Sequence, residues 1–314
     1  MMKRDLITGI SIAFSLIIAA AQVTKAQELK AAEIAEAPQQ TFYNVPEALA
    51  QKDKVYQLNI RQQNYYSFSP DICELVKLEF INAMKNKISD IAPEIAQLKQ
   101  LREINLSENN IRDLPPAFYS LQNLEQVDLS YNHLAELGNG FGNLSGLQVL
   151  DLNHNEIRTV DPAIKKMPRL HTLNLGYNHL EVIPSEIGSV KELKDLSLSQ
   201  NQLRELPANL FKMKELTTLS LDFNQLIAIP PQVGQAKALQ VLLLGHNQLK
   251  SIPKEVVNLD NLELLDLSHN HITALPRNLN KMKKLRTLLL AGNPISDSEK
   301  VRIKQLLPQA FIQF

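Results

Sequence analysis

The apolar positions of this chain recur with one fixed period, which equals the interval from Asn178 to Asn201. Leu193, Leu196 and Leu198 precede Asn201, and the order L-x-x-L-x-L-x-x-N-x-L starts again at Leu262. One asparagine marks each unit, at Asn86, Asn109, Asn132, Asn155, Asn178, Asn201, Asn224, Asn247, Asn270 and Asn293. Self-similarity at periods of roughly 20 to 50 residues is typical of repeat architectures. The pattern therefore predicts one short structural unit that is stacked many times.

The spacing inside each unit predicts its local structure. The L-x-L stretch reads as a short strand, whose alternate side chains point to opposite faces, so the leucines face inward. The asparagine is expected to turn inward and to satisfy backbone groups where the chain bends. An apolar-proline pair follows five and six residues later in six units, at Leu114-Pro115, Ile183-Pro184, Leu206-Pro207, Ile229-Pro230, Ile252-Pro253 and Leu275-Pro276. Proline has a fixed φ and no N–H, which suits an extended or 3₁₀-like return path.

On these residues the chain resembles the leucine-rich-repeat family, in its short 23-residue class with a Leu-Pro step. The resemblance covers residues 55–295, and in the degenerate first unit Gln63 takes the place of the asparagine. It implies an α/β leucine-rich-repeat solenoid, a horseshoe with a parallel β-sheet on its concave face, built from about eleven repeats.

The two ends of the array are expected to differ from the repeats, because terminal repeats must close the core. Residues 27–54 read as an N-terminal segment that ends in a half-repeat cap. Residues 296–314 read as a C-terminal cap, in which Ser296 and the acidic residues after it can begin a short helix.

Residues 1–26 have the pattern of a secretory signal peptide. Lys3 and Arg4 precede an apolar run over 6–21, and small residues follow up to Ala26. The run is shorter than the ~20 apolar residues of a spanning helix, and the alternative is an uncleaved N-terminal anchor. We therefore expect an exported protein, periplasmic, on the cell surface or secreted, of a bacterial type, with no membrane insertion once the signal is removed.

Composition narrows the choice of partner. The formal net charge is zero and the 33 basic residues are scattered, which disfavours nucleic acid as a ligand.

Cys73 is the only cysteine, so no internal disulfide can form, and its thiol is expected to be buried and inert.

The residue before each asparagine is predicted to lie along one edge of the concave face. Six of these ten positions carry an aromatic ring or an imidazole: Tyr131, His154, Tyr177, Phe223, His246 and His269. Rigid amphipathic side chains of this kind are favoured anchors at protein interfaces. The alternative is that the rings stack along the sheet only for stability.

The position between the two strand leucines is polar through most of the array and turns apolar near its C-terminal end. Leu243 and Leu289 stand at this position, with Val241 and Leu264 at the neighbouring outward position. These four residues predict an exposed apolar patch on the concave face, and such patches mark contacts. The alternative is that the C-terminal segment folds over them.

Catalytic or metal chemistry finds little support in the sequence. His246 and His269 should be close enough to share a divalent ion, but no third or fourth ligand accompanies them. Serines such as Ser130, Ser199 and Ser268 recur at one repeat position, which explains them without a catalytic triad. We therefore expect no enzyme activity, no metal and no cofactor.

Three functions compete at this stage. The first is an exported module, expected to be monomeric, that recognises a protein, and less readily a glycan, on its concave face. The second is an intracellular-type signalling scaffold without export, because scaffolds of small-GTPase signalling carry similar repeats. The third is a metal-dependent or catalytic protein. The fold cannot by itself identify the partner.

Overall fold

The computed structural model describes residues 40–314. The predicted signal peptide and residues 27–39 lie outside this range. Residues Thr41–Phe314 form one unit of the chain, and the description below concerns this unit.

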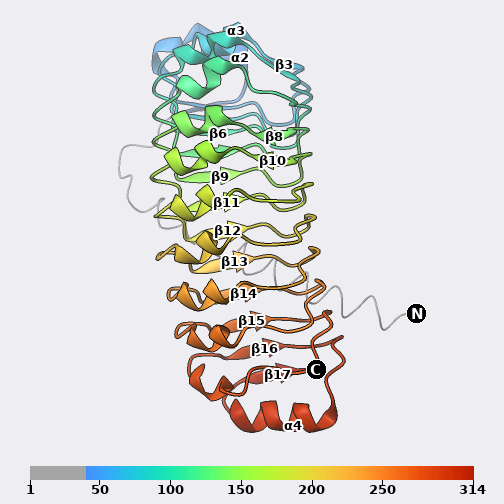
Figure 1. Cartoon of the computed structure of the whole chain (residues 1–314). Helices are drawn as coiled ribbons and strands as arrows, with labels where there is room; N and C mark the ends of the chain where they lie inside the picture. Colours follow the sequence, from blue (N-terminus) through green and yellow to red (C-terminus); the bar gives the residue numbers. More distant parts are fainter. Residues whose placement is uncertain (1–39) are drawn as a thin grey trace, which may run out of the picture. The chain divides into compact units, whose positions relative to one another are not determined.

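Thirteen short strands form one continuous parallel sheet in which neighbours follow the order of the sequence. Their bounds are β1 Thr41–Phe42, β2 Gln57–Asn59, β4 Phe80–Asn82, β6 Glu103–Asn105, β7 Gln126–Asp128, β9 Val149–Asp151, β11 Thr172–Asn174, β12 Asp195–Ser197, β13 Thr218–Ser220, β14 Val241–Leu243, β15 Leu264–Asp266, β16 Thr287–Leu289 and β17 Phe311–Gln313. Figure 1 shows them stacked one per repeat. The eleven strands from β2 to β16 recur with the period of the asparagines, so the predicted solenoid of about eleven repeats is confirmed.

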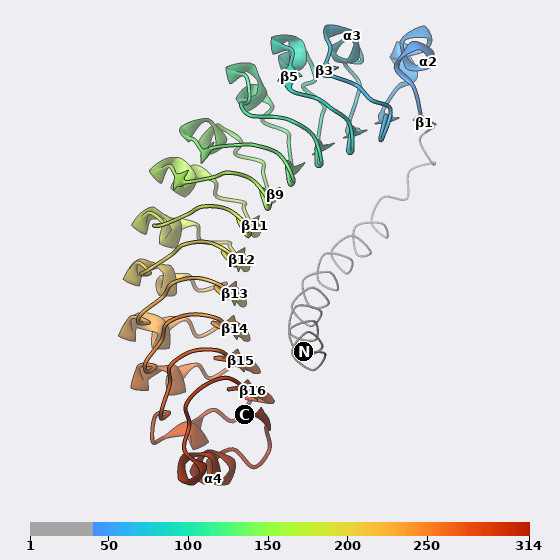
Figure 2. The ribbon, with the colours of Figure 1, turned by 90° about the vertical axis from the view of Figure 1, so that its right-hand side faces the viewer.

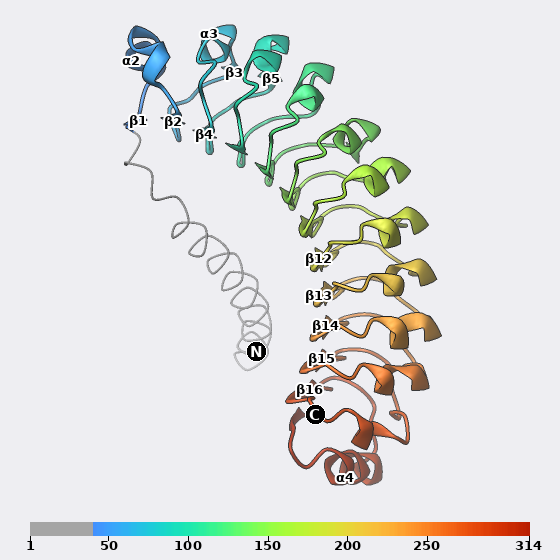
Figure 3. The same cartoon turned by 90° about the vertical axis from the view of Figure 1, so that its left-hand side faces the viewer.

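Each repeat leaves the sheet through a turn and returns through a short helix. Most of the helices are 3₁₀ helices: η1 Lys52–Lys54, η2 Pro93–Gln97, η3 Pro116–Ser120, η4 Asn139–Asn143, η5 Pro162–Lys166, η6 Ser185–Ser189, η7 Ala208–Lys212, η8 Pro231–Gln235, η9 Lys254–Asn258 and η10 Leu279–Lys281. Figures 2 and 3 show the strands on the inner, concave side of the repeat unit and these helices on the outer side. The concave face is therefore made by strands and by the turns that follow them.

The predicted asparagines close the backbone between repeats. In Asn178, Oδ1 accepts the N–H of Ile157 at 2.9 Å, and Nδ2 donates to the carbonyls of Leu152 at 3.0 Å and Leu175 at 3.1 Å. The same pattern recurs at the other positions, and nine of the ten asparagines are buried. A buried backbone group without a partner is costly, so this single side chain stabilises two successive turns.

Two further strand pairs lie outside the main sheet, in repeats whose return path has no proline directly after its apolar residue. They are β3 Ser67–Phe68 with β5 Asp90–Ile91, and β8 Glu136–Leu137 with β10 Thr159–Val160. Ala92 donates its N–H to Phe68 at 3.0 Å, and Asp161 donates to Leu137 at 2.8 Å. Pro115, at the equivalent position between the two pairs, has no N–H to donate. The proline step therefore interrupts this second ladder.

Three α-helices complete the unit: α2 Val45–Ala50, α3 Pro70–Cys73 and α4 Asp297–Leu306. The side chain of Asn44 caps α2 by accepting the N–H of Glu47 at 2.8 Å. At the other end, Arg302 in α4 donates to the carbonyl of Leu275 at 2.8 Å, while Glu299 accepts the N–H of Leu275 at 2.9 Å. These contacts fasten α4 to the last repeats.

Candidate partner-binding face

The residue before each asparagine has an unusual backbone conformation that the sequence did not suggest. From Lys85 to His269 these residues have φ between 51° and 57°, and Gly292 has φ 76°. This is the left-handed region, which most side chains avoid. The conformation turns the chain out of the strand and places these side chains in a row along one edge of the concave sheet.

The rings in this row stack on one another in two groups of three. In the first group, the ring of His154 lies 4.0 Å from the ring of Tyr131 and 4.0 Å from that of Tyr177, with planes 12° and 13° apart. In the second, the ring of His246 lies 4.1 Å from Phe223 and 4.2 Å from His269. We call them the Tyr131–Tyr177 stack and the Phe223–His269 stack.

Non-aromatic residues set the limits of the two stacks. Gln200 separates them, and Gly292 follows the second stack without a side chain. At the other end Lys85 and Glu108 occupy the same row and form an ion pair at 3.5 Å. Along this edge the chain therefore has a charged pair, a first ring stack, Gln200, a second ring stack and finally Gly292.

Stacking covers ring faces and leaves ring edges exposed. Tyr131 is 51% exposed and Tyr177 is 44% exposed, although one face of each is covered by His154. Burial between the rings lowers the pKa of His154, and burial together with the neighbouring His269 lowers the pKa of His246. Both imidazoles are therefore held toward the neutral form at neutral pH.

The polar residues between the strand leucines form hydrogen bonds to the backbone in addition to lining the concave face. Asn82, Asn105, Asp128, Asp151, Asn174 and Asp266 each accept the backbone N–H of the second residue after them, at 2.8–3.1 Å. Short side chains with an acceptor oxygen commonly bond the backbone in this way. The row is polar because it caps the strand ends, which the repeat pattern alone did not reveal.

Two carboxylates meet in the middle of this row. Asp128 and Asp151 are register partners on β7 and β9. Amides flank them on both sides, because Asn105 donates to Asp128 at 3.1 Å and Asn174 donates to Asp151 at 3.3 Å. Burial, and then the charge of Asp128, raise the pKa of Asp151 to about 6. Two aspartates at the same position of successive repeats were the available signal for this pair.

A chain of hydrogen bonds links this carboxylate to the Tyr131–Tyr177 stack. Asn153 donates from Nδ2 to Asp151 at 2.5 Å, and its Oδ1 lies 2.6 Å from Nδ1 of His154. An amide oxygen only accepts, so Nδ1 of neutral His154 carries the proton. Its Nε2 is therefore an acceptor.

The predicted apolar patch needs one correction. Leu243 is only 7% exposed, so the expectation that it is an exposed patch residue is wrong, whereas Val241, Leu264 and Leu289 are half-buried. Leu243 lies in register between Ser220 and Asp266, and neighbouring strands stand only about 4.7–4.9 Å apart. Side chains on the inner side of a curved sheet are crowded, which covers Leu243.

The C-terminal segment does not provide that cover. Strand β17 pairs with β16 in register, Phe311 opposite Thr287 and Gln313 opposite Leu289, and so continues the sheet. The half-buried residues Val241 and Leu264 lie on β14 and β15, the two strands before β16.

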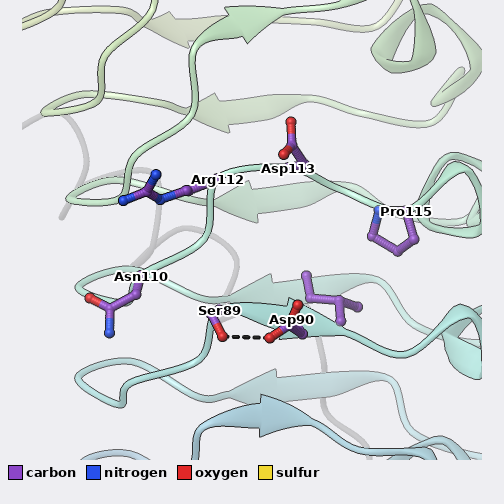
Figure 4. A pocket seen from close by; sticks show the side chains of 7 residues that line it. Ser89, Asp90, Asn110, Arg112, Asp113 and Pro115 are labelled. Carbon is purple, nitrogen blue, oxygen red and sulfur yellow. Dashed lines mark hydrogen bonds between the residues drawn. The ribbon is translucent and has the colours of Figure 1, made fainter.

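An open depression of about 580 Å³ lies where the second ladder is interrupted. Ile91 and Pro115 line it together with Ser89, Asp90, Asn110, Arg112 and Asp113 (Figure 4). Ser89 donates to Asp90 at 2.5 Å, while Arg112 points away from both (Figure 4). The polar groups that line this depression do not converge on one point.

Other chemistry finds no site within residues 40–314. No group of three or more His, Cys, Asp or Glu side chains in this range could hold a metal ion. Cys73 is buried, and burial raises the pKa of its thiol to about 12, which makes it unreactive. Over the same residues no helix has the length and apolar character needed to cross a bilayer.

The repeated strand, asparagine turn and return helix define a parallel β-solenoid whose strands lie on its concave face. The chain belongs to the leucine-rich repeat family: the family model described as leucine rich repeat matches residues 76–134, 138–180, 168–226 and 237–295. No curated protein matches the sequence.

Solved structures with this fold come from several kingdoms. An internalin, InlF, of Listeria monocytogenes is similar with a TM-score of 0.77 and 24% identity, over 88% of this chain and 78% of that chain. The plant peptide hormone receptor RGFR1 in complex with RGF2 gives a TM-score of 0.68 and 26% identity, over 77% of this chain and 40% of that chain. The Toll–Spatzle complex of Drosophila gives a TM-score of 0.70 and 22% identity, over 82% of this chain and 35% of that chain. At these identities the similarity establishes the fold.

Proposed function

We propose that this protein is an exported, monomeric recognition module that binds a protein partner on its concave face. The observation that carries the proposal is the pair of ring stacks, the first of which leaves Tyr131 51% exposed and Tyr177 44% exposed on that face. Aromatic side chains that are already ordered lose little conformational freedom on binding, so they favour affinity.

The rest of the concave face supports the same conclusion. The half-buried Val241 and Leu264 lie on β14 and β15, in the same repeats as His246 and His269 of the Phe223–His269 stack. Apolar residues together with aromatic anchors are typical of the centre of a protein interface. The plant receptor RGFR1 and Toll, which have the same fold, were solved in complexes with RGF2 and Spatzle.

A glycan partner is the weaker alternative. Sugars bind aromatic side chains through the ring faces, and His154 has both of its faces covered by neighbouring rings. The middle ring of each stack offers only its edge, and each outer ring keeps one face that no other ring covers. A polypeptide, which offers backbone donors and apolar side chains to such edges, suits the surface better.

The experiment is affinity capture from an extract of the native envelope and its surroundings, with matched variants. Tyr177→Ala and Leu264→Asp should each reduce recovery of the partner at least tenfold. Val182→Asp is the control, since Val182 is 58% exposed and lies on the return segment outside the sheet. Equal capture by all four proteins would place the binding surface elsewhere.

Export and oligomeric state have separate tests. We expect a mature N-terminus near Gln27 in the envelope or the medium, and a full-length chain in the cytoplasm would favour the intracellular scaffold instead. Sedimentation of the mature protein should give the mass of one chain.

A further inference from the structure

The concave face carries an excess of negative charge. Four positions of each repeat line this side, namely the two outward positions of the strand and the two turn residues before the asparagine position. Over the eleven repeats these positions hold seven acidic residues: Glu103, Glu108, Asp128, Asp151, Asp195, Asp222 and Asp266. They hold two basic residues, Arg61 and Lys85, and Lys85 forms an ion pair with Glu108.

This excess reflects how charge is distributed and not the composition of the chain, whose formal net charge is zero. Part of the balancing positive charge lies in the return segment of the last repeat, outside the four concave positions. All basic residues of this segment, residues 277–286, are exposed, and the segment has no acidic residue: Arg277, Lys281, Lys283, Lys284 and Arg286. A neutral protein therefore presents a negative face on one side.

Neutral donors satisfy the two central carboxylates. Asp128 accepts from the N–H of Ser130 at 3.0 Å, from its hydroxyl at 2.6 Å and from Asn105 at 3.1 Å. Asp151 accepts from Asn174 at 3.3 Å and from the N–H of Asn153 at 3.0 Å. These bonds hold both carboxylates in place, but they cancel none of the negative charge.

The aspartates on this face also act on one another. Burial, and then the charge of Asp128, raise the pKa of Asp151 to about 6, and burial together with the charge of Asp266 raises the pKa of Asp222. A carboxyl with a pKa of about 6 is still ionised at neutral pH. An incoming positive charge favours the ionised form and would relieve this repulsion.

The spread of these residues excludes a small cation as the matching ligand. Asp128 on β7 and Asp266 on β15 are separated by six strand steps, which is roughly 30 Å along the sheet. Within residues 40–314 no group of three or more His, Cys, Asp or Glu side chains could hold a metal ion. A ligand that matches the whole face is elongated and carries several positive charges.

We propose that the partner presents a basic polypeptide segment to this face, with arginine or lysine side chains opposite Asp128 and Asp151. The inference rests on the proposed function, which makes the concave face the binding surface, and it adds the chemical class of the partner. The Tyr131–Tyr177 stack lies directly beside these carboxylates, because Asn153 joins Asp151 to His154. Complementary charge steers a partner to its site and selects it over others.

The test is binding of a fluorescent decapeptide of alternating arginine and glycine to the mature protein, measured by anisotropy. Its glutamate-glycine counterpart is the control peptide. The arginine peptide should bind saturably and more weakly as salt rises, since exposed charges are screened within about 10 Å at 0.1 M salt. Equal binding of both peptides, or no saturable binding of the arginine peptide at low salt, would overturn the proposal.

A matched pair of double variants separates the face from the overall charge. Asp128→Asn with Asp151→Asn should weaken binding of the arginine peptide about tenfold. Glu181→Gln with Glu205→Gln changes the net charge equally on exposed return segments and should weaken it by less than about twofold. Equal effects of the two double variants, each checked for folding by its melting curve, would overturn the proposal.

The unsubstituted protein gives a second readout that needs no variant to fold. Titration with the arginine peptide should shift the carboxyl ¹³C signals of Asp128 and Asp151 saturably and leave those of Glu181 and Glu205 in place. Saturable binding without a shift at either aspartate would also overturn the proposal.

These outcomes are distinguishable from those of the capture experiment. Loss of capture by Tyr177→Ala and Leu264→Asp, without any response of the aspartates to the peptide, would keep the proposed function and overturn the basic partner. A response of the aspartates to the peptide, with normal capture by both capture variants, would refute the proposed function and keep the affinity of this face for basic peptides.

Discussion

The side chain of Asn178 accepts the backbone N–H of Ile157, 21 residues earlier, at 2.9 Å. The same amide donates to the carbonyls of Leu152 and Leu175. One side chain thus joins two neighbouring repeats, and its loss has a calculable effect.

Asn178→Ala should lower the free energy of unfolding by about 1–3 kcal/mol, because it leaves the buried N–H of Ile157 without a partner. The carbonyls of Leu152 and Leu175 still accept from Asn155 and Asn201. Urea unfolding followed by circular dichroism measures the change. Asn123→Ala is the control: Asn123 is exposed and makes a single bond to Lys99, so its loss should cost less than about 0.5 kcal/mol. Similar effects of both substitutions would show that the asparagine row does not stabilise the turns.

The left-handed conformation gives a second prediction, at Gln200. Its φ is 56°, a region in which a β-branched residue is strongly disfavoured. Gln200→Val should therefore be less stable than Gln200→Gly by about 1–2 kcal/mol. Thermal unfolding of the two variants side by side measures this difference.

Gln202 provides the control, since it lies two residues further on in the same turn and has no positive φ. The difference between valine and glycine should disappear or reverse there. If valine were tolerated equally at Gln200 and Gln202, the residues before the asparagines would not depend on the left-handed backbone conformation.

The spacing of apolar residues and asparagines along the chain predicted the fold, because every repeat shares the same spacing. The constant period of the asparagines implied parallel strands in register, and alternation within L-x-L implied which leucines are buried; Leu173 and Leu196, for example, are register partners in the core. A pattern repeated along the chain reports local geometry that every repeat shares.

Details that depend on neighbouring repeats were harder to predict. Leu243 was expected to be exposed from its position in the strand, and the side chains around it on the concave face bury it. The left-handed φ of the ten residues before the asparagines leaves one trace in the sequence, because none of the ten is β-branched. The stacking of His154 between two tyrosines depends on ring orientations, which spacing does not determine.

A matched pair of proline substitutions tests the second ladder. Ala92 has φ −60° and donates its N–H to Phe68 at 3.0 Å, so Ala92→Pro keeps the backbone but removes a hydrogen bond. It should lower the free energy of unfolding by about 1–3 kcal/mol. Gly138 has φ −76°, and Gly138→Pro should raise stability by about 0.5–1 kcal/mol by restricting the unfolded chain.

Both substitutions create a step of the kind that Pro115 already makes between them. Chemical denaturation of the two variants distinguishes the roles of the bond and of chain stiffness. Equal stabilisation by both would mean that the bond between Ala92 and Phe68 contributes nothing.

The carboxyl pair on the concave face predicts how stability depends on pH. Burial and the charge of Asp128 raise the pKa of Asp151 from 3.8 to about 6. The folded protein therefore holds this proton more tightly than the unfolded chain does, so the group contributes stability at low pH that is lost as the pH rises from about 4 through 6. Asp151→Asn lacks this dependence, and its stability relative to the unsubstituted protein should increase by about 1–3 kcal/mol between pH 4 and pH 8.

Asp128→Asn separates the two causes of this shift. It removes the neighbouring charge but not the burial, which is the larger cause, so the pKa of Asp151 should fall only part of the way to its ordinary value. Carboxyl ¹³C NMR measures that pKa directly, and urea unfolding at several pH values measures the stability difference. A pH-independent difference between Asp151→Asn and the unsubstituted protein would contradict the prediction, because it would mean that Asp151 titrates alike in the folded and unfolded chains.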